Sequence, residues 1–94
     1  MIVNFKSKET EKVFNRKWSS KLPEHIQRRA RIKLQLLNRA ETINDMRSPP
    51  SHHLEHLKGS RKNQYSIRIN GQWRICFEWH INNSYNVEII DYHN

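Results

Sequence analysis

The segment of residues 65–77 constrains the fold most, because it has the alternating pattern of a β-hairpin. Apolar and polar side chains alternate on both sides of Asn70-Gly71, and this pair accepts the positive φ angles of tight hairpin turns. A loop of three residues, 70–72, keeps the large apolar side chains of both strands on one face. A loop of two residues would mix them with charged side chains, so we expect the three-residue loop.

This register gives the predicted hairpin two different faces. The apolar face holds three facing pairs: Ile69 with Trp73, Ile67 with Ile75, and Tyr65 with Phe77. The opposite face carries Ser66, Arg68, Arg74 and Cys76. The hairpin is thus predicted to have an apolar back that faces the core and a cationic front.

Two helices are expected before the hairpin. Ser7 can cap a helix that begins near Lys8 and ends near Lys17. A second helix begins near Pro23, a residue that the first helical position accepts. Its apolar stripe has helical spacing and consists of Ile26, Ala30, Leu34 and Leu37. Its basic residues, placed mostly on the remaining surface, are Arg28, Arg29, Arg31, Lys33 and Arg39. That surface is either solvated or a contact for nucleic acid or an acidic partner.

Strands complete the expected architecture. We predict short strands over residues 1–5 and 54–57 and a last strand over 85–92, while residues 42–45 have the spacing of a capping box. The order is then one strand, two helices, and three or four antiparallel strands, with the helices packed on one sheet face. This is an α+β fold. A chain of 94 residues is predicted to form a single domain, 1–94.

The composition indicates which classes of binding partner to expect. The net charge is +8, which favours a polyanionic partner such as RNA, DNA or an acidic protein, although charge also serves solubility alone. No long apolar run and no terminal basic amphipathic helix is seen, so no membrane partner is expected. Cys76 is the single cysteine, and no leader or membrane-spanning segment is recognised, which favours a cytoplasmic protein.

Several side chains near the hairpin suggest chemistry on RNA. The cationic front presents Arg68 and Arg74, and arginine binds phosphate in a bidentate way. An antiparallel sheet can bring to the same end Glu55, His56, Lys58 and Arg61, together with Asp91, Tyr92 and His93. Tyrosine stacks on bases and histidine exchanges protons near neutral pH. These groups supply what cleavage by the 2′-hydroxyl of RNA needs, with no metal or other cofactor. The alternative is that the arginines only solubilise the strand and the terminal groups are inert.

A metal site and a catalytic thiol are not favoured. His52, His53 and His56 lie beside two prolines, without a nearby cysteine or a helical His-x-x-x-His spacing, which is a weak basis for zinc. Cys76 has no recognisable nucleophile partners, so we expect a small packed residue.

Four short motifs resemble a known family when taken together. They are Leu54-Glu55-His56-Leu57-Lys58-Gly59, Tyr65-Ser66-Ile67, Trp73-Arg74-Ile75 and Asp91-Tyr92-His93. In this order they resemble the HigB-type toxins of the RelE superfamily, also called plasmid maintenance system killer proteins. The resemblance covers the whole chain and is densest from Leu54 onward.

The resemblance implies a compact RelE-like α+β fold and a defined activity. Such type II toxins are ribosome-dependent endoribonucleases that enter the ribosomal A site, cut mRNA there without a metal, and so inhibit translation. A cognate HigA-like antitoxin with a helix-turn-helix DNA-binding domain neutralises them. The complex represses its own operon, so operator DNA is contacted only through the antitoxin complex. The expected partners are therefore the antitoxin, the ribosome and mRNA.

The resemblance also assigns roles to residues. Lys58 and Arg74 match residues that contact and neutralise the scissile phosphate. Asp91 would orient the site, Tyr92 would stack on a base or transfer a proton, and His93 would act as acid–base or positioning group. Further RNA or ribosome contacts are expected from the basic turn before the hairpin and from the hairpin itself: Arg61, Lys62, Arg68 and His56. Arg68 matches no family position and depends on the hairpin pattern alone.

One position departs from the family. Some members carry a histidine directly after the leucine of the Leu54 motif, where this chain has Glu55, and His56 follows one residue later. A shift of one residue along a strand turns the side chain to the other face. Either Glu55 takes the role, or His56 reaches it through an irregular backbone, or the site is weakened. A carboxylate beside Lys58 is a weak base, so we expect a nuclease of modest activity.

Two other functions fit part of the sequence. A ParE-like inhibitor of DNA gyrase would share the fold but lack the phosphate-contacting residues. A plain basic RNA-binding module would explain the charge and leave the terminal triplet unexplained.

Overall fold

The structure is a computed structural model that describes residues 1–61 and 63–92. Its α-helices are α1 (Lys8–Phe14) and α2 (Glu24–Arg39). Its strands are β1 (Glu55–His56), β2 (Gln64–Arg68), β3 (Trp73–His80) and β4 (Asn83–Asp91). Three short 3-10 helices connect them: η1 (Ile43–Arg47), η2 (Pro50–His52) and η3 (Gly59–Arg61).

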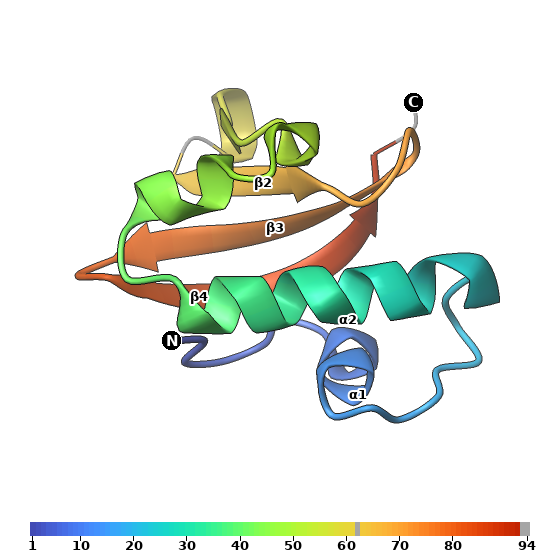
Figure 1. Cartoon of the computed structure of the whole chain (residues 1–94). Helices are drawn as coiled ribbons and strands as arrows, with labels where there is room; N and C mark the ends of the chain where they lie inside the picture. The colour runs from blue at the N-terminus through green and yellow to red at the C-terminus, as the bar shows by residue number, and fades with distance from the viewer. Residues whose placement is uncertain (62, 93–94) are drawn as a thin grey trace.

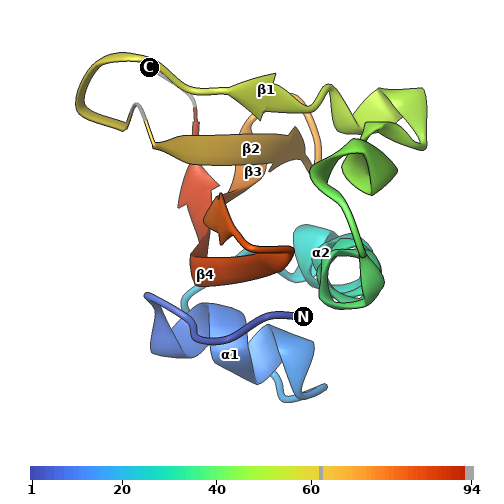
Figure 2. The ribbon, with the colours of Figure 1, turned by 90° about the vertical axis from the view of Figure 1, so that its left-hand side faces the viewer.

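The strands form one antiparallel sheet in the order β1-β2-β3-β4. Figure 1 shows α2 running along β3 and β4, and Figure 2 shows α2 beside β4, with α1 below them. The predicted α+β class, with helices on one face of an antiparallel sheet, is therefore confirmed. Among the described residues, neither helix has the length and apolar character needed to cross a lipid bilayer.

The expected opening strand is reduced to two isolated parallel bridges. Ile2 pairs with Ser84, and Phe5 pairs with Val87, outside the named strands. Between the bridges, the Asn4 side-chain oxygen accepts a hydrogen bond from the backbone N–H of Asn86, which has a φ of 52°. A left-handed residue at this point interrupts regular pairing, so the segment follows β4 without becoming a strand.

The two helices begin close to where the sequence predicts. The Ser7 hydroxyl accepts a hydrogen bond from the Thr10 N–H, as an N-cap does. The first helix ends at Phe14, earlier than expected, and Arg16 then takes a positive φ of 62°. In α2 the whole predicted apolar stripe is buried. The placement of Lys33 on the basic surface was wrong, because this side chain is buried too.

The hairpin has the predicted register. Tyr65 pairs with Phe77 and Ile67 with Ile75, and the Ile69 N–H donates to the Trp73 carbonyl at 2.8 Å. Inside the loop, the Asn70 side-chain oxygen accepts hydrogen bonds from the N–H groups of Gln72 and Trp73, both at 2.8 Å. These bonds take the place of strand pairing and fix the three-residue loop.

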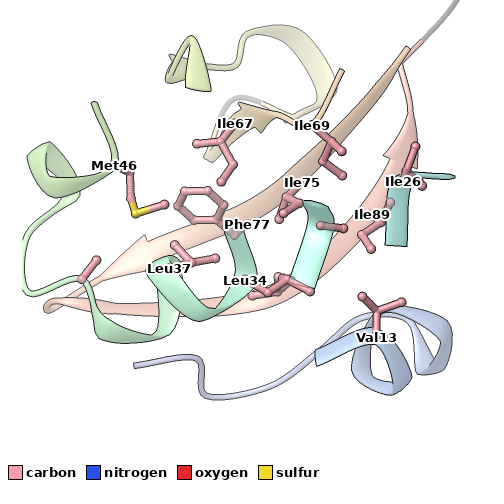
Figure 3. Packing of buried hydrophobic residues seen from close by; sticks show 13 residues of the cluster. Val13, Ile26, Leu34, Leu37, Met46, Ile67, Ile69, Ile75, Phe77 and Ile89 are labelled. Carbon is pink, nitrogen blue, oxygen red and sulfur yellow. The ribbon is translucent and has the colours of Figure 1, made fainter. Parts of the chain in front are cut away.

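The core lies between α2 and the back of the sheet. In Figure 3, Phe77 and Ile75 point from the sheet toward Leu37 and Leu34 of α2. Met46, from η1, closes one end of this layer. All five side chains are almost fully buried, so this layer holds the hairpin in place for the residues on its front.

Candidate active site

The front of the sheet, opposite the helices, carries two rows of facing residues. One row crosses all four strands through Glu55, Ser66, Cys76 and Glu88. The next row contains Arg68, Arg74 and Ile90. The prediction of a cationic front holds for the arginines, but it missed that Ser66 is buried, next to the buried Cys76. Their burial gives the front a packed floor beneath the charged groups.

Cys76 lies in that floor. Burial raises the pKa of its thiol to about 11, with smaller opposing effects from the surrounding charges. A thiol that stays protonated at neutral pH is a poor nucleophile. The expected role as a small packed residue fits this environment.

Arg74 is the most constrained cation of the front. Its Nη2 donates a hydrogen bond of 2.7 Å to the His53 carbonyl, and lies 4.0 Å from Oε1 of Glu55. The ring centroid of Tyr92 lies 5.1 Å from the Arg74 Cζ, in a cation–π contact. Only 13% of the Arg74 side chain is exposed. The guanidinium is therefore fixed in orientation before any ligand arrives.

Two grooves adjoin this arginine. The Arg74 groove, of about 540 Å³, is lined by His53, Leu54, Glu55, Arg68, Asn70, Gly71, Arg74 and Tyr92. The Lys58 groove, of about 430 Å³, is lined by Glu55, His56, Leu57, Lys58, Ser60, Arg61 and Tyr92. Glu55 and Tyr92 line both grooves, so the two grooves are adjacent and together form the candidate site. The structure thus brings together Lys58, Arg74, Tyr92 and Glu55, as predicted from distant parts of the chain.

The two candidates at the Leu54 motif take different positions. Glu55 faces the front and approaches Arg74. His56 pairs with Tyr65 and stacks on its ring, with centroids 4.5 Å apart and planes inclined by 14°. Alternation along β1 therefore places the carboxylate, and not the imidazole, beside the arginine.

Arg61 lines the Lys58 groove but is already engaged. Its Nη1 donates to the Glu88 carboxylate at 3.1 Å and to the Gln64 side-chain oxygen at 2.9 Å. These bonds connect η3 to β2 and β4, so Arg61 contributes to the rim of the groove as well as to its charge. Its predicted contact with RNA stays a prediction.

Asp91 lies beside the grooves and does not line either of them. Its Oδ2 accepts a hydrogen bond of 3.0 Å from the Gln72 side chain, and the Tyr92 N–H donates to the Gln72 carbonyl at 2.6 Å. The end of β4 is thus fastened to the hairpin loop, which positions Tyr92. His93 and Lys62, two further predicted residues, lie outside the described residues.

Comparisons with known proteins show which family this chain belongs to. A model of the family "RelE-like toxin of type II toxin-antitoxin system HigB" matches residues 3–93. The chain belongs to this HigB-like toxin family. It is 36% identical over 80 residues to "Toxin HigB-1" of Vibrio cholerae, covering 84% of each chain. It is 30% identical over 93 residues to "Endoribonuclease HigB" of Proteus vulgaris, covering 99% of this chain and all of that one. It is also 39% identical over 74 residues to an uncharacterized protein of Haemophilus influenzae.

Membership of a type II toxin–antitoxin family implies that this HigB-like toxin has an antitoxin partner. The resemblance on which the sequence interpretation depends is therefore confirmed. Among residues 1–61 and 63–92, no cluster of three His, Cys, Asp or Glu side chains is placed to hold a metal ion.

The sequence interpretation of this HigB-like toxin missed one residue that contacts Arg74, His53. Its backbone is left-handed, with φ 45° and ψ 55°, and this conformation directs its carbonyl to Arg74. Every residue has a backbone carbonyl, so the residue type does not indicate which carbonyl contacts Arg74. The only available signal was the prolines just before it, which indicated an irregular connection into β1.

Proposed function

We propose that this HigB-like toxin is a ribosome-dependent endoribonuclease that cleaves mRNA in the ribosomal A site and so inhibits translation. The observation that carries the proposal is the oriented Arg74 beneath Tyr92, at the junction of two grooves that also hold Lys58 and Glu55. A fixed arginine and a nearby lysine suit a phosphate that gains charge during the reaction. The name of the Proteus vulgaris relative supports an activity on RNA.

Cleavage would proceed without a metal, by attack of the 2′-oxygen on the adjacent phosphorus. A base takes the 2′-hydroxyl proton, the new P–O bond closes a 2′,3′-cyclic phosphate, and an acid protonates the departing 5′-oxygen. Arg74 and Lys58 stabilise the phosphorane, and Tyr92 stacks on a base next to the cut. Glu55 is the base candidate that lies beside Arg74. His93 is proposed as the acid from its place in the terminal motif.

The dependence on the ribosome has a physical basis. In the free toxin, the Arg74 Nη2 is occupied by the His53 carbonyl and faces Glu55. A phosphate must replace the Glu55 contact, and a carboxylate partly paired with an arginine is a weak general base. Alignment of the 2′-hydroxyl by the ribosome would compensate, because correct orientation alone contributes several powers of ten in rate. We therefore propose modest activity that is negligible on free RNA.

The antitoxin is proposed to be a HigA-like protein with a helix-turn-helix domain. In this arrangement the toxin reaches operator DNA only through the complex. The support is the family match together with the net charge of +8, which suits an acidic partner surface.

The test is a translation reaction with purified ribosomes and one defined mRNA, followed by mapping of the new 5′ ends. Wild type should cut within A-site codons, Arg74→Ala and Tyr92→Ala should cut far less, and Arg28→Ala should match wild type. Arg28 is the matched control because it is an exposed arginine of α2 that lines neither groove.

Intact mRNA in the presence of an active, growth-arresting wild type would refute the nuclease. If arrest then persisted in Arg74→Ala and was accompanied by DNA damage, the gyrase-inhibitor alternative would replace it. RNA binding without toxicity would instead favour the plain binding module.

A further inference from the structure

A third cavity, which we call the Lys33 cavity, lies between α2, η2 and the hairpin turn. Its volume is about 550 Å³. α2 contributes Arg29 and Lys33 to its lining, η2 contributes His52, and the hairpin contributes Arg68. Among the described residues, no Asp or Glu lines it. The cavity is therefore strongly cationic, and the proposed cleavage mechanism uses none of the groups on its α2 side.

Lys33 is an unusual lysine because only 8% of it is exposed. Within the described part of the chain, no carboxylate forms an ion pair with it. Burial lowers its pKa, and the nearby Arg29 lowers it further. A buried ammonium without a counter-ion is costly, and an anion in the cavity would remove much of that cost.

His52 provides a second, independent observation. It is fully buried, and its Nδ1 lies 3.1 Å from the Met46 carbonyl. A carbonyl only accepts hydrogen bonds, so Nδ1 carries the proton of the neutral ring. Nε2 is buried and has no hydrogen-bond partner among the described residues. Burial, followed by the charge of Lys33, lowers the pKa of His52.

We propose that the Lys33 cavity is a binding site for a phosphate-type oxyanion. Lys33 and Arg68 supply the charge, Arg29 adds a further cation, and His52 forms a polar part of the wall. A bound anion favours the protonated imidazole, and Nε2 then becomes a hydrogen-bond donor. Two sources fit this chemistry: free phosphate, or a backbone phosphate of an RNA strand.

The second source fits the position of the cavity. His53, Arg68, Asn70 and Gly71 line both the Lys33 cavity and the Arg74 groove. A strand in the Arg74 groove could therefore continue past Arg68 with its next phosphates near Lys33. Binding of the anion itself does not depend on the proposed function, because it requires neither cleavage nor the ribosome.

The experiment is a titration of the free toxin, at constant ionic strength, with inorganic phosphate in one arm. The other arm uses a short RNA with 2′-O-methyl groups, which cannot be cleaved by its own 2′-oxygen. The ring signals of His52 in NMR spectra report binding. We expect saturable shifts in at least one arm and a rise in Tm on addition of the anion. Lys33→Met should weaken binding by about tenfold, since a buried charged hydrogen bond contributes roughly that much, and Arg68→Gln should weaken it by no more than about fivefold, because Arg68 is exposed.

Lys8→Met is the matched control, because Lys8 is an exposed lysine of α1 and its loss changes the net charge equally. It should bind like wild type. Lys33→Met removes a buried charge. Arg68 is exposed, so we expect at least Arg68→Gln to keep the folded state. Stronger binding of the RNA, with competition by phosphate, would identify the RNA backbone as the source. Equal binding would identify free phosphate.

Two results would overturn the proposal. One is the absence of saturable shifts of the His52 ring in both arms. The other is equal weakening by Lys33→Met and Lys8→Met, which would show that general charge, and not this cavity, attracts the anion.

Discussion

The two faces of the hairpin differ in what their buried residues do. On the back, Ile67, Ile75 and Phe77 pack against α2 in an apolar layer. On the front, Ser66 and Cys76 are equally buried but lie under charged groups, with Arg68 and Arg74 facing each other across the strands. Like charges in facing positions destabilise a sheet. The apolar back therefore stabilises the fold, whereas the fixed cationic site on the front lowers the stability.

The strongest test of this contrast is Phe77→Ala. Phe77 is fully buried, and loss of its ring should lower the free energy of unfolding by about 3–5 kcal/mol. Chemical denaturation measures this change, and Phe77→Leu is the milder control. A loss below about 1 kcal/mol would show that the back is not the main source of stability.

The second test is Arg74→Ala on the front. Removal of a fixed donor to a developing negative charge should slow ribosome-dependent cleavage by about 10²–10³-fold. Stability should change much less than in Phe77→Ala, because an arginine facing a like charge is lost. Arg74→Lys keeps the charge but not the planar fork, so it should restore only part of the rate. If Arg74→Ala lowered both the cleavage rate and the Tm strongly, the front would contribute to stability as the back does, which would contradict the proposed difference between the two faces.

The third test concerns His52, a buried residue of η2 that lines the Lys33 cavity. Burial lowers its pKa below the ordinary value of 6.5, so the unfolded chain binds more protons in mildly acidic solution. Stability is therefore fully present above pH of about 6.5 and is lost as pH falls below that value. Thermal unfolding across this range, in buffer without phosphate, measures the loss. His52→Gln should flatten the curve, and an unchanged curve in this variant would assign the acid sensitivity to other groups.

The smallest effect on cleavage is expected from Arg68→Ala. Arg68 is exposed, and a solvated cation contributes about 1 kcal/mol or less, so the rate should fall no more than roughly fivefold. The same ribosome assay compares it with Arg74→Ala. If Arg68→Ala and Arg74→Ala lowered the cleavage rate equally, the contacts of Arg74 with His53 and Tyr92 would not matter for the rate. A place on the front of the sheet would then be sufficient for an arginine to contribute.

The sequence was sufficient for features that depend on local periodicity. Alternation of side chains determined the register from Tyr65 to Phe77, and helical spacing identified the stripe of α2. The same rules do not describe what a distant segment covers. Lys33 is a charged residue at helical spacing from Ala30 and Leu37, so its position follows from periodicity, but the cavity that η2 and the hairpin turn form with it does not.

The placement of the candidate site residues was predictable to a similar degree. Motif order selected Arg74, Lys58 and Tyr92, which the structure places at the two grooves, and alternation explains why Glu55 rather than His56 faces Arg74. Asp91 shares the terminal motif with Tyr92 but lies opposite Trp73, on the other side of the strand from Arg74. The His53 carbonyl could not be found, because its direction depends on backbone angles that no side chain encodes.

The fastening of β4 to the hairpin loop affects how the protein can be engineered. Surface loops usually tolerate inserted peptides. In the loop at 70–72, the backbone and side chain of Gln72 hold Tyr92 and Asp91, so an insertion would also displace the aromatic ring over Arg74. The turn at Ile81 and Asn82 is exposed, and neither residue lines either groove. It is the better place to graft an epitope or a reporter into an active toxin.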